Sequence, residues 1–511
     1  MFFRFIGLLL FLILLPTSLL FAQADLQQID RYIQQAQKDW GIPGLSVAIV
    51  KDGEIVLEKG YGQIEVGKAQ AVDAHSVYAI ASNTKAFIST ALAMLVEENK
   101  IQWDDPVKQY LPDFELYDDY VTQNTSIRDL LCHRVGLGTF SGDVVWYKSE
   151  YQAAELVQRL QHVPQAFPFR SGYGYSNLMF ITAGEVIKAV SGQSWDQFIQ
   201  ERIFKPLDMN RSHTSIKALT TMDNVASPHK PIAGKHQPIP YVNWDNMGAA
   251  GGILSSVHDM AQWLQLQLNH GIWGKDTLFQ RSSQEVLWTP HNNFPVRQST
   301  RQLFPDRQFS GYGLGWGLSD YGGQMLVSHG GGYDGMYSRV VLVPNQELGI
   351  VVLTNGMKGI SSWLTYYIID AYLQKEPTDW SEKGLGFQNR RDEYQAKQMK
   401  ELKAKRKLNT QPDLPLSELA GEYESPLFGP VNIQYKDKKL FLHFPKAPSL
   451  DAELRHWHLN TFEILWKEIH AWFDFGTLQF VLDNTGEVQD LQFHVPNNDI
   501  FFEEIKAKRR D

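Results

Sequence analysis

Strand patterns stand at both ends of the first three quarters of this chain, and helical patterns fill the interval between them. The strand-like runs are residues 45–50, 55–59, 324–328, 337–343 and 349–354. Segments so far apart in the chain can form one sheet only if the residues between them fold over it. We therefore expect an α/β (α+β) fold whose sheet is assembled from both ends of this region.

A region of different composition follows. Residues 376–415 are rich in charge and are typical of a solvated helical linker. From residue 416 to residue 511, short strand-like runs alternate with turns, at residues 421–424, 431–435, 440–444, 472–482 and 488–494. This spacing predicts a small antiparallel β-barrel-like domain. The chain then divides into a main domain over 25–375, the linker over 376–415 and a C-terminal β domain over 416–511.

The first 24 residues have the pattern of an export signal. A single charge, Arg4, precedes an apolar run over residues 5–21, and Ala22-Gln23-Ala24 supplies small residues at an A-x-A cleavage position. Residues 1–24 are therefore predicted to be a signal peptide cleaved after Ala24, and the protein to be secreted or periplasmic. The alternative is an uncleaved membrane anchor, because about 17 apolar residues are the lower limit for a span. We expect no stable membrane span after cleavage.

Charge and cysteine content exclude several function classes. Lys and Arg number 48 against 57 Asp and Glu, a net charge of −9, which is not the footprint of a nucleic-acid-binding protein. The single cysteine, Cys132, excludes an internal disulfide and every cysteine-rich metal site. His456 and His458 share one face of a strand-like run, but no third ligand accompanies them, so no metal site is predicted. We expect a small-molecule or peptide substrate and no nucleic-acid partner, and the oligomeric state stays open.

A serine and a lysine one helical turn apart give the first chemical signal. Ser82-Asn83-Thr84-Lys85 begins a helical pattern that runs to Asn99, so the serine and lysine side chains lie on one face. The helix dipole favours a developing anion at Ser82. A lysine that is held close and partly desolvated has a lowered pKa and accepts a serine proton more readily. The spacing makes Ser82 a candidate nucleophile and Lys85 its base.

This motif is not specific when it stands alone. Ser227-Pro228-His229-Lys230 matches the same spacing, although Pro228 favours a loop there. The alternative interpretation of the first match makes Ser82 a helix N-cap beside a solvated Lys85. The choice between the two interpretations depends on the other residues that accompany Ser82.

Two further elements follow in the chain. Tyr175-Ser176-Asn177 stands between a Gly-rich turn and a helical pattern, and His329-Gly330-Gly331-Gly332 follows a strand pattern. Together with Ser82-x-x-Lys85, they resemble the serine β-lactamase-like, penicillin-binding-protein-like hydrolases: class C β-lactamases and their D-aminopeptidase, D,D-peptidase and esterase relatives. The resemblance implies a β-lactamase/transpeptidase-like domain with a central, mostly antiparallel sheet and a helical subdomain. The C-terminal unit resembles the lipocalin-like domain of certain peptidases that cleave peptides containing D-amino acids.

The family resemblance implies a role for each of these residues. Ser82 attacks a substrate carbonyl and forms an acyl-enzyme, while Lys85 and Tyr175 share its proton, each with a pKa below its free value. Asn177 binds Lys85 and the amide side of the substrate. The backbone N–H groups of Ser82 and Gly332 form the oxyanion hole. No metal or organic cofactor is implied.

The glycine-rich strand departs from the usual family pattern. His329, Gly330 and Gly331 are expected to bind substrate, with the glycines leaving room for it along the strand edge. Most β-lactamases carry Lys-Thr-Gly here, and the lysine binds the carboxylate of the drug. Histidine is largely neutral at pH 7, so we expect weaker carboxylate binding. This favours an exported serine hydrolase acting on an amide, a peptide (D-amino-acid-containing peptides included) or an ester. The alternatives are a true class C-like β-lactamase and a non-hydrolysing penicillin-binding sensor.

Overall fold

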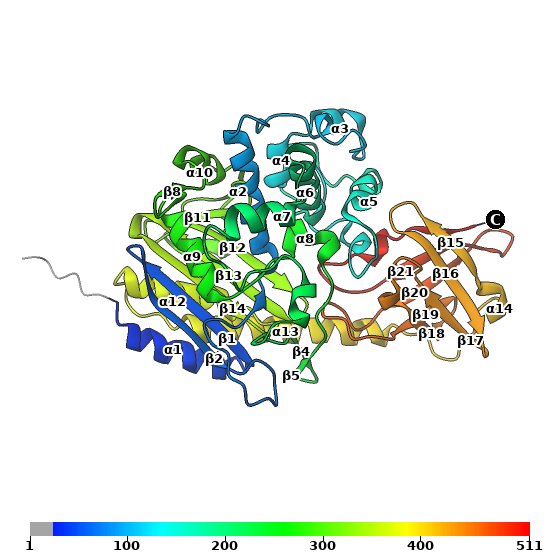
Figure 1. Cartoon of the computed structure of the whole chain (residues 1–511). Coiled ribbons are helices and arrows are strands. Elements are labelled where there is room, and N and C mark those ends of the chain that lie inside the picture. Colours follow the sequence, from blue (N-terminus) through cyan, green and yellow to red (C-terminus); the bar gives the residue numbers. More distant parts are fainter. Residues whose placement is uncertain (1–23, 511) are drawn as a thin grey trace, which may run out of the picture.

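The computed structural model describes residues 24–510, so the predicted signal peptide, Ala24 excepted, lies outside the described residues. An eight-stranded antiparallel sheet, in the order β2-β1-β14-β13-β12-β11-β10-β9, organises the main body (Figure 1). Its strands are β1 (Gly44–Lys51), β2 (Glu54–Gly62), β9 (Asn292–Asn293), β10 (Ser310–Tyr312), β11 (Gly317–Tyr321), β12 (Gln324–Tyr333), β13 (Met336–Val343) and β14 (Leu348–Thr354). Strand β1 pairs with β14, with Leu45 opposite Thr354. The predicted sheet assembled from both ends of the region is confirmed.

Helices cover both faces of this sheet. Val47 and Ile49 of β1 pack in one cluster with Ile29 of α1 (Leu26–Asp39) and with residues of α12 (Ile360–Tyr372). Ala48 and Val50 point the other way, into a cluster that includes residues of α9 (Val257–Leu268). Successive strand residues face opposite sides of a sheet, so burial on both sides explains why these strands are continuous apolar runs.

The middle of the chain forms the helical part of the main body. Besides α9, its α-helices are α2 (Thr84–Glu97), α3 (Asp119–Asn124), α4 (Ile127–Leu131), α5 (Ala153–Gln158), α6 (Asn177–Ser191), α7 (Trp195–Ile199), α8 (Gly248–Gly251), α10 (Arg281–Leu287) and α11 (Gln298–Leu303). Three small sheets join β3 (Tyr78–Ala79) to β6 (Leu254–Ser255), β4 (His229–Ile232) to β5 (Lys235–Pro238), and β7 (Ile272–Trp273) to β8 (Asp276–Thr277). Helix α2 is buried along most of its length, because α6 and α8 pack around it.

The C-terminal residues form a closed eight-stranded barrel in which β15 pairs with β22. Its strands are β15 (Gly421–Ser425), β16 (Gly429–Lys436), β17 (Lys439–His443), β18 (Ala452–His458), β19 (Thr461–Trp466), β20 (Thr477–Leu482), β21 (Val488–His494) and β22 (Ala507–Arg509). The predicted barrel is confirmed. One of its predicted strands is too long, because residues 472–476 form a loop before β20.

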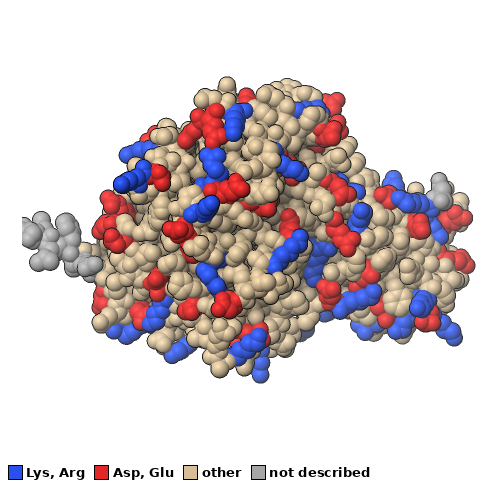
Figure 2. All heavy atoms as spheres, in the orientation of Figure 1, with Lys and Arg blue, Asp and Glu red and all other residues tan. Residues whose placement is uncertain are grey.

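A long helix leads to the barrel. Helix α13 (Trp380–Ala404) runs below the main body toward the barrel, whose first strand follows the short α14 (Leu416–Leu419) (Figure 1). Acidic and basic side chains are interspersed over the face drawn in Figure 2. Among the described residues, no helix is both long and apolar enough to cross a membrane.

Candidate active site

Ser82 lies in a tight turn at the entrance to α2. Residues Ala81–Asn83 form a 3-10 turn, and Ala81 has a φ of 47°, in the left-handed region that costs an alanine roughly 1–2 kcal/mol. The N-cap of α2 is Asn83, which makes no side-chain capping bond, whereas the Ser82 hydroxyl is hydrogen-bonded to Lys85. The N-cap interpretation of Ser82 is therefore wrong, and the turn instead presents its hydroxyl to the lysine.

Lys85 is fully buried and lies at the centre of the site. Its Nζ is 3.0 Å from Ser82 Oγ and donates to Asn177 Oδ1 and to the Ala250 carbonyl oxygen, each at 2.7 Å. The same nitrogen also lies 4.8 Å from the centre of the Tyr175 ring. Burial holds the pKa of Lys85 well below its usual value, as the sequence predicted, and nearby Asp143 opposes this shift.

Asp143 is a member of the site that the sequence analysis missed. Asn177 Nδ2 donates to Asp143 Oδ2 at 2.6 Å, so the amide of Asn177 bridges Asp143 and Lys85. Burial raises the pKa of Asp143 to about 8, while the hydrogen bond from Asn177 and the nearby Lys85 oppose this shift. The available signal was a single acidic residue within the otherwise apolar stretch that follows Gly142.

Tyr175 approaches the serine from the start of α6. Its backbone carbonyl accepts from Phe140 N at 2.8 Å, and its ring lies 4.4 Å from that of His133. His133 Nδ1 accepts from Ser176 N at 3.1 Å, so this histidine helps to place the tyrosine. Burial raises the pKa of Tyr175 well above its usual value, although a hydrogen bond with Ser82 partly opposes the shift. The expectation that its pKa is lowered is therefore wrong, because desolvation outweighs that hydrogen bond.

His329 is neutral and fully engaged with protein groups. Its Nδ1 lies 2.6 Å from the Gly330 carbonyl oxygen, which only accepts, so Nδ1 carries the proton and Nε2 accepts from the Tyr312 hydroxyl at 2.8 Å. Burial lowers the pKa of His329 to about 3, and the charge of Lys85 acts in the same direction. The imidazole therefore supplies no positive charge for a substrate carboxylate at neutral pH.

The three glycines after His329 have different neighbours on the two faces of β12. A Cβ on Gly331 would lie 2.3 Å from the Ile80 carbonyl oxygen, so this glycine allows β12 to approach the turn that carries Ser82. On the other face, a Cβ on Gly332 would lie 3.4 Å from the Trp472 ring. A Cβ on Gly330 would make only ordinary van der Waals contacts, the nearest of them 3.6 Å from Arg339. Because these Cβ positions lie on the two faces of β12, the expected room for substrate along the edge of the strand stays a prediction. Residues 329–333 lie beyond the part of β12 that pairs with β11, so this stretch has a sheet neighbour on one side only.

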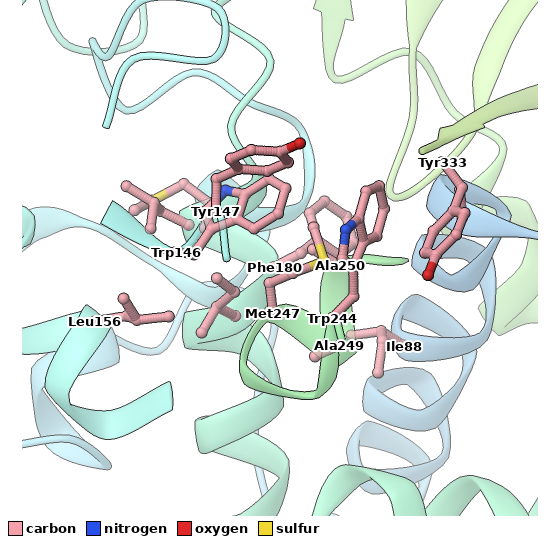
Figure 3. Packing of buried hydrophobic residues seen from close by; sticks show 14 of the residues in the cluster. Ile88, Trp146, Tyr147, Leu156, Phe180, Trp244, Met247, Ala249, Ala250 and Tyr333 are labelled. Carbon is pink, nitrogen blue, oxygen red and sulfur yellow. The ribbon is translucent and has the colours of Figure 1, made fainter. Parts of the chain in front are cut away.

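Aromatic side chains gather beside Tyr333 at the end of β12. Rings of Trp146, Tyr147, Trp244 and Tyr333 pack together in Figure 3, with 5.3 Å between the ring centres of Trp146 and Trp244 and 4.6 Å between those of Trp244 and Tyr333. Buried Asp334 joins this group, because it accepts from the Tyr147 hydroxyl at 2.8 Å and from Trp244 Nε1 at 3.2 Å. This cluster fixes the surroundings of the end of β12.

The other candidate motifs have structural partners. The Ser227 hydroxyl binds Glu65, while Lys230 donates to Asp474 Oδ1 in the barrel at 2.6 Å, so the second Ser-x-x-Lys match does not bring its own two residues together. His456 Nε2 binds the Leu459 carbonyl oxygen at 2.8 Å, and the strand is irregular between His456 and His458. No group of three or more potential metal ligands occurs within residues 24–510.

Comparison with known proteins places this site in a family. The model of the beta-lactamase family matches residues 29–371. The chain belongs to the beta-lactamase family. The predicted kinship with β-lactamase-like, penicillin-binding-protein-like serine hydrolases is thereby confirmed. The barrel matches a second model, described as a domain of unknown function, over residues 405–509.

Curated relatives and solved structures extend this family assignment. Unguisins hydrolase ungD' of Aspergillus campestris is 28% identical over 454 residues, which is 83% of this chain and 80% of that protein. Protein flp of Staphylococcus aureus is 31% identical over 342 residues, or 64% of this chain and 63% of that protein. The octameric penicillin-binding protein homologue of Pyrococcus abyssi shares the fold over 95% of this chain and 100% of its own, with a TM-score of 0.62 and 20% identity. SurE, solved with D-Leu, gives a TM-score of 0.53 at 17% identity and covers 95% of this chain and 99% of its own.

Proposed function

We propose that this beta-lactamase family member is an exported serine hydrolase that forms an acyl-enzyme on Ser82 with an amide, peptide or ester substrate. One observation carries the proposal. Lys85 Nζ lies 3.0 Å from Ser82 Oγ in a buried position that lowers the pKa of the lysine. A neutral amine at hydrogen-bonding distance from a hydroxyl is a suitable general base for nucleophilic attack.

The pKa directions divide the proton transfers between the two groups. As Ser82 Oγ bonds to the substrate carbonyl carbon, its proton passes to neutral Lys85. The oxyanion accepts hydrogen bonds from the backbone N–H groups of Ser82 and Gly332. Tyr175, whose high pKa keeps it protonated, donates its phenolic proton to the leaving group as the carbonyl–leaving-group bond breaks. The Lys85 ammonium then returns a proton to Tyr175, and water hydrolyses the acyl-enzyme.

Neutral His329 favours peptides and esters over β-lactams as substrates. A β-lactam carboxylate gains little from an imidazole whose pKa is about 3 and whose two nitrogens are occupied by Tyr312 and Gly330. The relationship to an unguisins hydrolase and the shared fold with SurE, which was solved with D-Leu, support the choice of D-amino-acid peptides as test substrates.

Export belongs to the same proposal and rests on the pattern of residues 1–24. When the full chain is produced in a Gram-negative host, we expect the mature protein in the periplasmic fraction, with Asp25 at its N-terminus by mass spectrometry. An intact Met1 in a membrane fraction would favour the anchor instead.

The nucleophile is tested with a fluorophosphonate and a fluorescent penicillin. We expect labelling of the wild type, none in Ser82→Ala, and wild-type labelling in Ser227→Ala, which removes the serine of the second Ser-x-x-Lys match. Labelling of Ser82→Ala as strong as that of the wild type would contradict the assignment.

Turnover of three substrates separates the remaining alternatives. We expect hydrolysis of a p-nitrophenyl ester or a D-Ala-D-Ala peptide at a higher kcat/KM than that of a chromogenic cephalosporin. Fast hydrolysis of the cephalosporin alone would identify a β-lactamase. Stoichiometric labelling of Ser82 with turnover of none of the three would identify a sensor.

A further inference from the structure

One loop of the barrel lies against the strand beside Ser82. Trp472 belongs to residues 467–476, which connect β19 and β20, and its side chain is half-buried. Its ring lies 3.4 Å from the position that a Cβ on Gly332 would occupy. Gly332 is the residue whose N–H group we assign to the oxyanion, so any group bonded to the reacting carbonyl carbon on that side lies near the indole.

The loop is firmly held in this position. Lys230 of β4 is buried and donates to Asp474 Oδ1 at 2.6 Å and to the backbone carbonyl oxygens of His470 and Phe473. Asp334 accepts a hydrogen bond from Trp472 in addition to the one from Tyr147. Lys230 of the main body therefore holds the loop, and the hydrogen bond to Asp334 holds the indole of Trp472.

The two ends of the glycine strand differ in what surrounds them. Tyr175, the proposed proton donor to the leaving group, lies near His329, with 6.2 Å between the ring centres. Trp472 lies at the opposite end, beside Gly332 and Asp334. A substrate whose leaving group faces Tyr175 must extend its acyl group toward the indole.

We propose that Trp472 is a specificity-determining residue that limits the size of the acyl group transferred to Ser82. This inference rests on the proposed function. A fixed aromatic ring next to a reacting carbonyl excludes bulky groups by overlap, and a fixed environment does not relax to admit them. The barrel thus contributes a residue to the site of the main body.

The test compares p-nitrophenyl esters that share a leaving group and differ in acyl group. The kcat/KM of p-nitrophenol release measures acylation whether deacylation is fast or slow. For Trp472→Ala, we expect the ratio of phenylacetate to acetate acylation rates to rise about 10-fold over the wild type. Lys230→Met, which removes the anchor of the loop and leaves the indole intact, is expected to raise the ratio in the same direction.

A matched variant controls for general effects on the barrel. Tyr435→Ala removes an exposed aromatic side chain of β16, a strand that pairs with β15 and β17, and we expect its ratio to equal that of the wild type. A ratio in Trp472→Ala that stays within 2-fold of the wild type, or falls, would overturn the inference. Failure of the proposed function would instead appear in the wild type, as the absence of p-nitrophenol release and of Ser82 labelling.

Discussion

Burial sets the protonation states around Ser82. It lowers the pKa of Lys85 and raises that of Tyr175, so desolvation prepares a neutral base and a neutral acid on the two sides of one hydroxyl. Charged forms of both groups would lack the water that stabilises them elsewhere. The two side chains are therefore suited to different proton transfers, although the sequence predicted the same direction of shift for both.

The rate of acylation should follow the deprotonation of Lys85. Only the neutral amine accepts the Ser82 proton, so the rate should rise with pH through the lowered pKa of Lys85, at pH values well below 10.5. Lys85→Met should lower the rate by about 10²- to 10⁴-fold and abolish this dependence. Fluorophosphonate labelling rates from pH 5 to pH 9 provide the measurement.

An exposed lysine gives the control for this prediction. Lys188 lies at the surface near Glu185, and Lys188→Met should keep the wild-type rate and pH dependence. If Lys85→Met labels at more than a tenth of the wild-type rate, or shows the same rise with pH, Lys85 is not the base.

At the level of elements, periodicity located the secondary structure but not its limits. The predicted helix 82–99 is observed as a 3-10 turn at Ala81–Asn83 followed by α2, because a hydrophobic pattern does not distinguish the two kinds of turn. Strand β12 continues to Tyr333 although the prediction ends at residue 328, since glycines carry no side-chain pattern. The aromatic-rich run at residues 472–476 is predicted to be a strand, yet contacts with a distant lysine hold it as a loop.

The same limits apply to the candidate site. Ser82, Lys85, Tyr175 and Asn177 could be selected from the sequence, because local spacing and the family resemblance mark them. Asp143 could not, since its contribution depends on an amide that is distant in the chain. Residues of this kind have an ordinary local context, and only the packing of the helices brings them to the lysine.

At the level of the whole molecule, the barrel and the main body share a polar boundary close to the site. Glu504 of the barrel accepts from the Ser141 hydroxyl at 2.5 Å and from Gly142 N at 2.6 Å, immediately before Asp143. A chain of hydrogen bonds then runs through Asn177 to Lys85. The sequence predicted a barrel but gave no sign of where it docks, because these contacts join segments more than 300 residues apart.

The same boundary should make the protein sensitive to acid. His470 is buried among the rings of Tyr147, Trp466 and Phe473, and neither ring nitrogen has a hydrogen-bond partner among the described residues. Burial lowers the pKa of His470 to about 2. Below pH 6.5 the unfolded chain binds a proton at this histidine and the folded chain does not, so stability falls as the pH decreases toward 2.

A single substitution should remove the part of this dependence that His470 causes. At pH 5 the neutral state of His470 costs about 2 kcal/mol of unfolding free energy relative to pH 7, and His470→Phe should abolish that loss while retaining the aromatic packing. Urea unfolding of the wild type and the variant at both pH values measures it. His494→Gln, at an exposed barrel position, controls for the loss of a surface imidazole. His470→Phe removes the only titratable group at this position. If the variant loses as much stability between pH 7 and pH 5 as the wild type does, the buried imidazole is not the group that couples this boundary to pH.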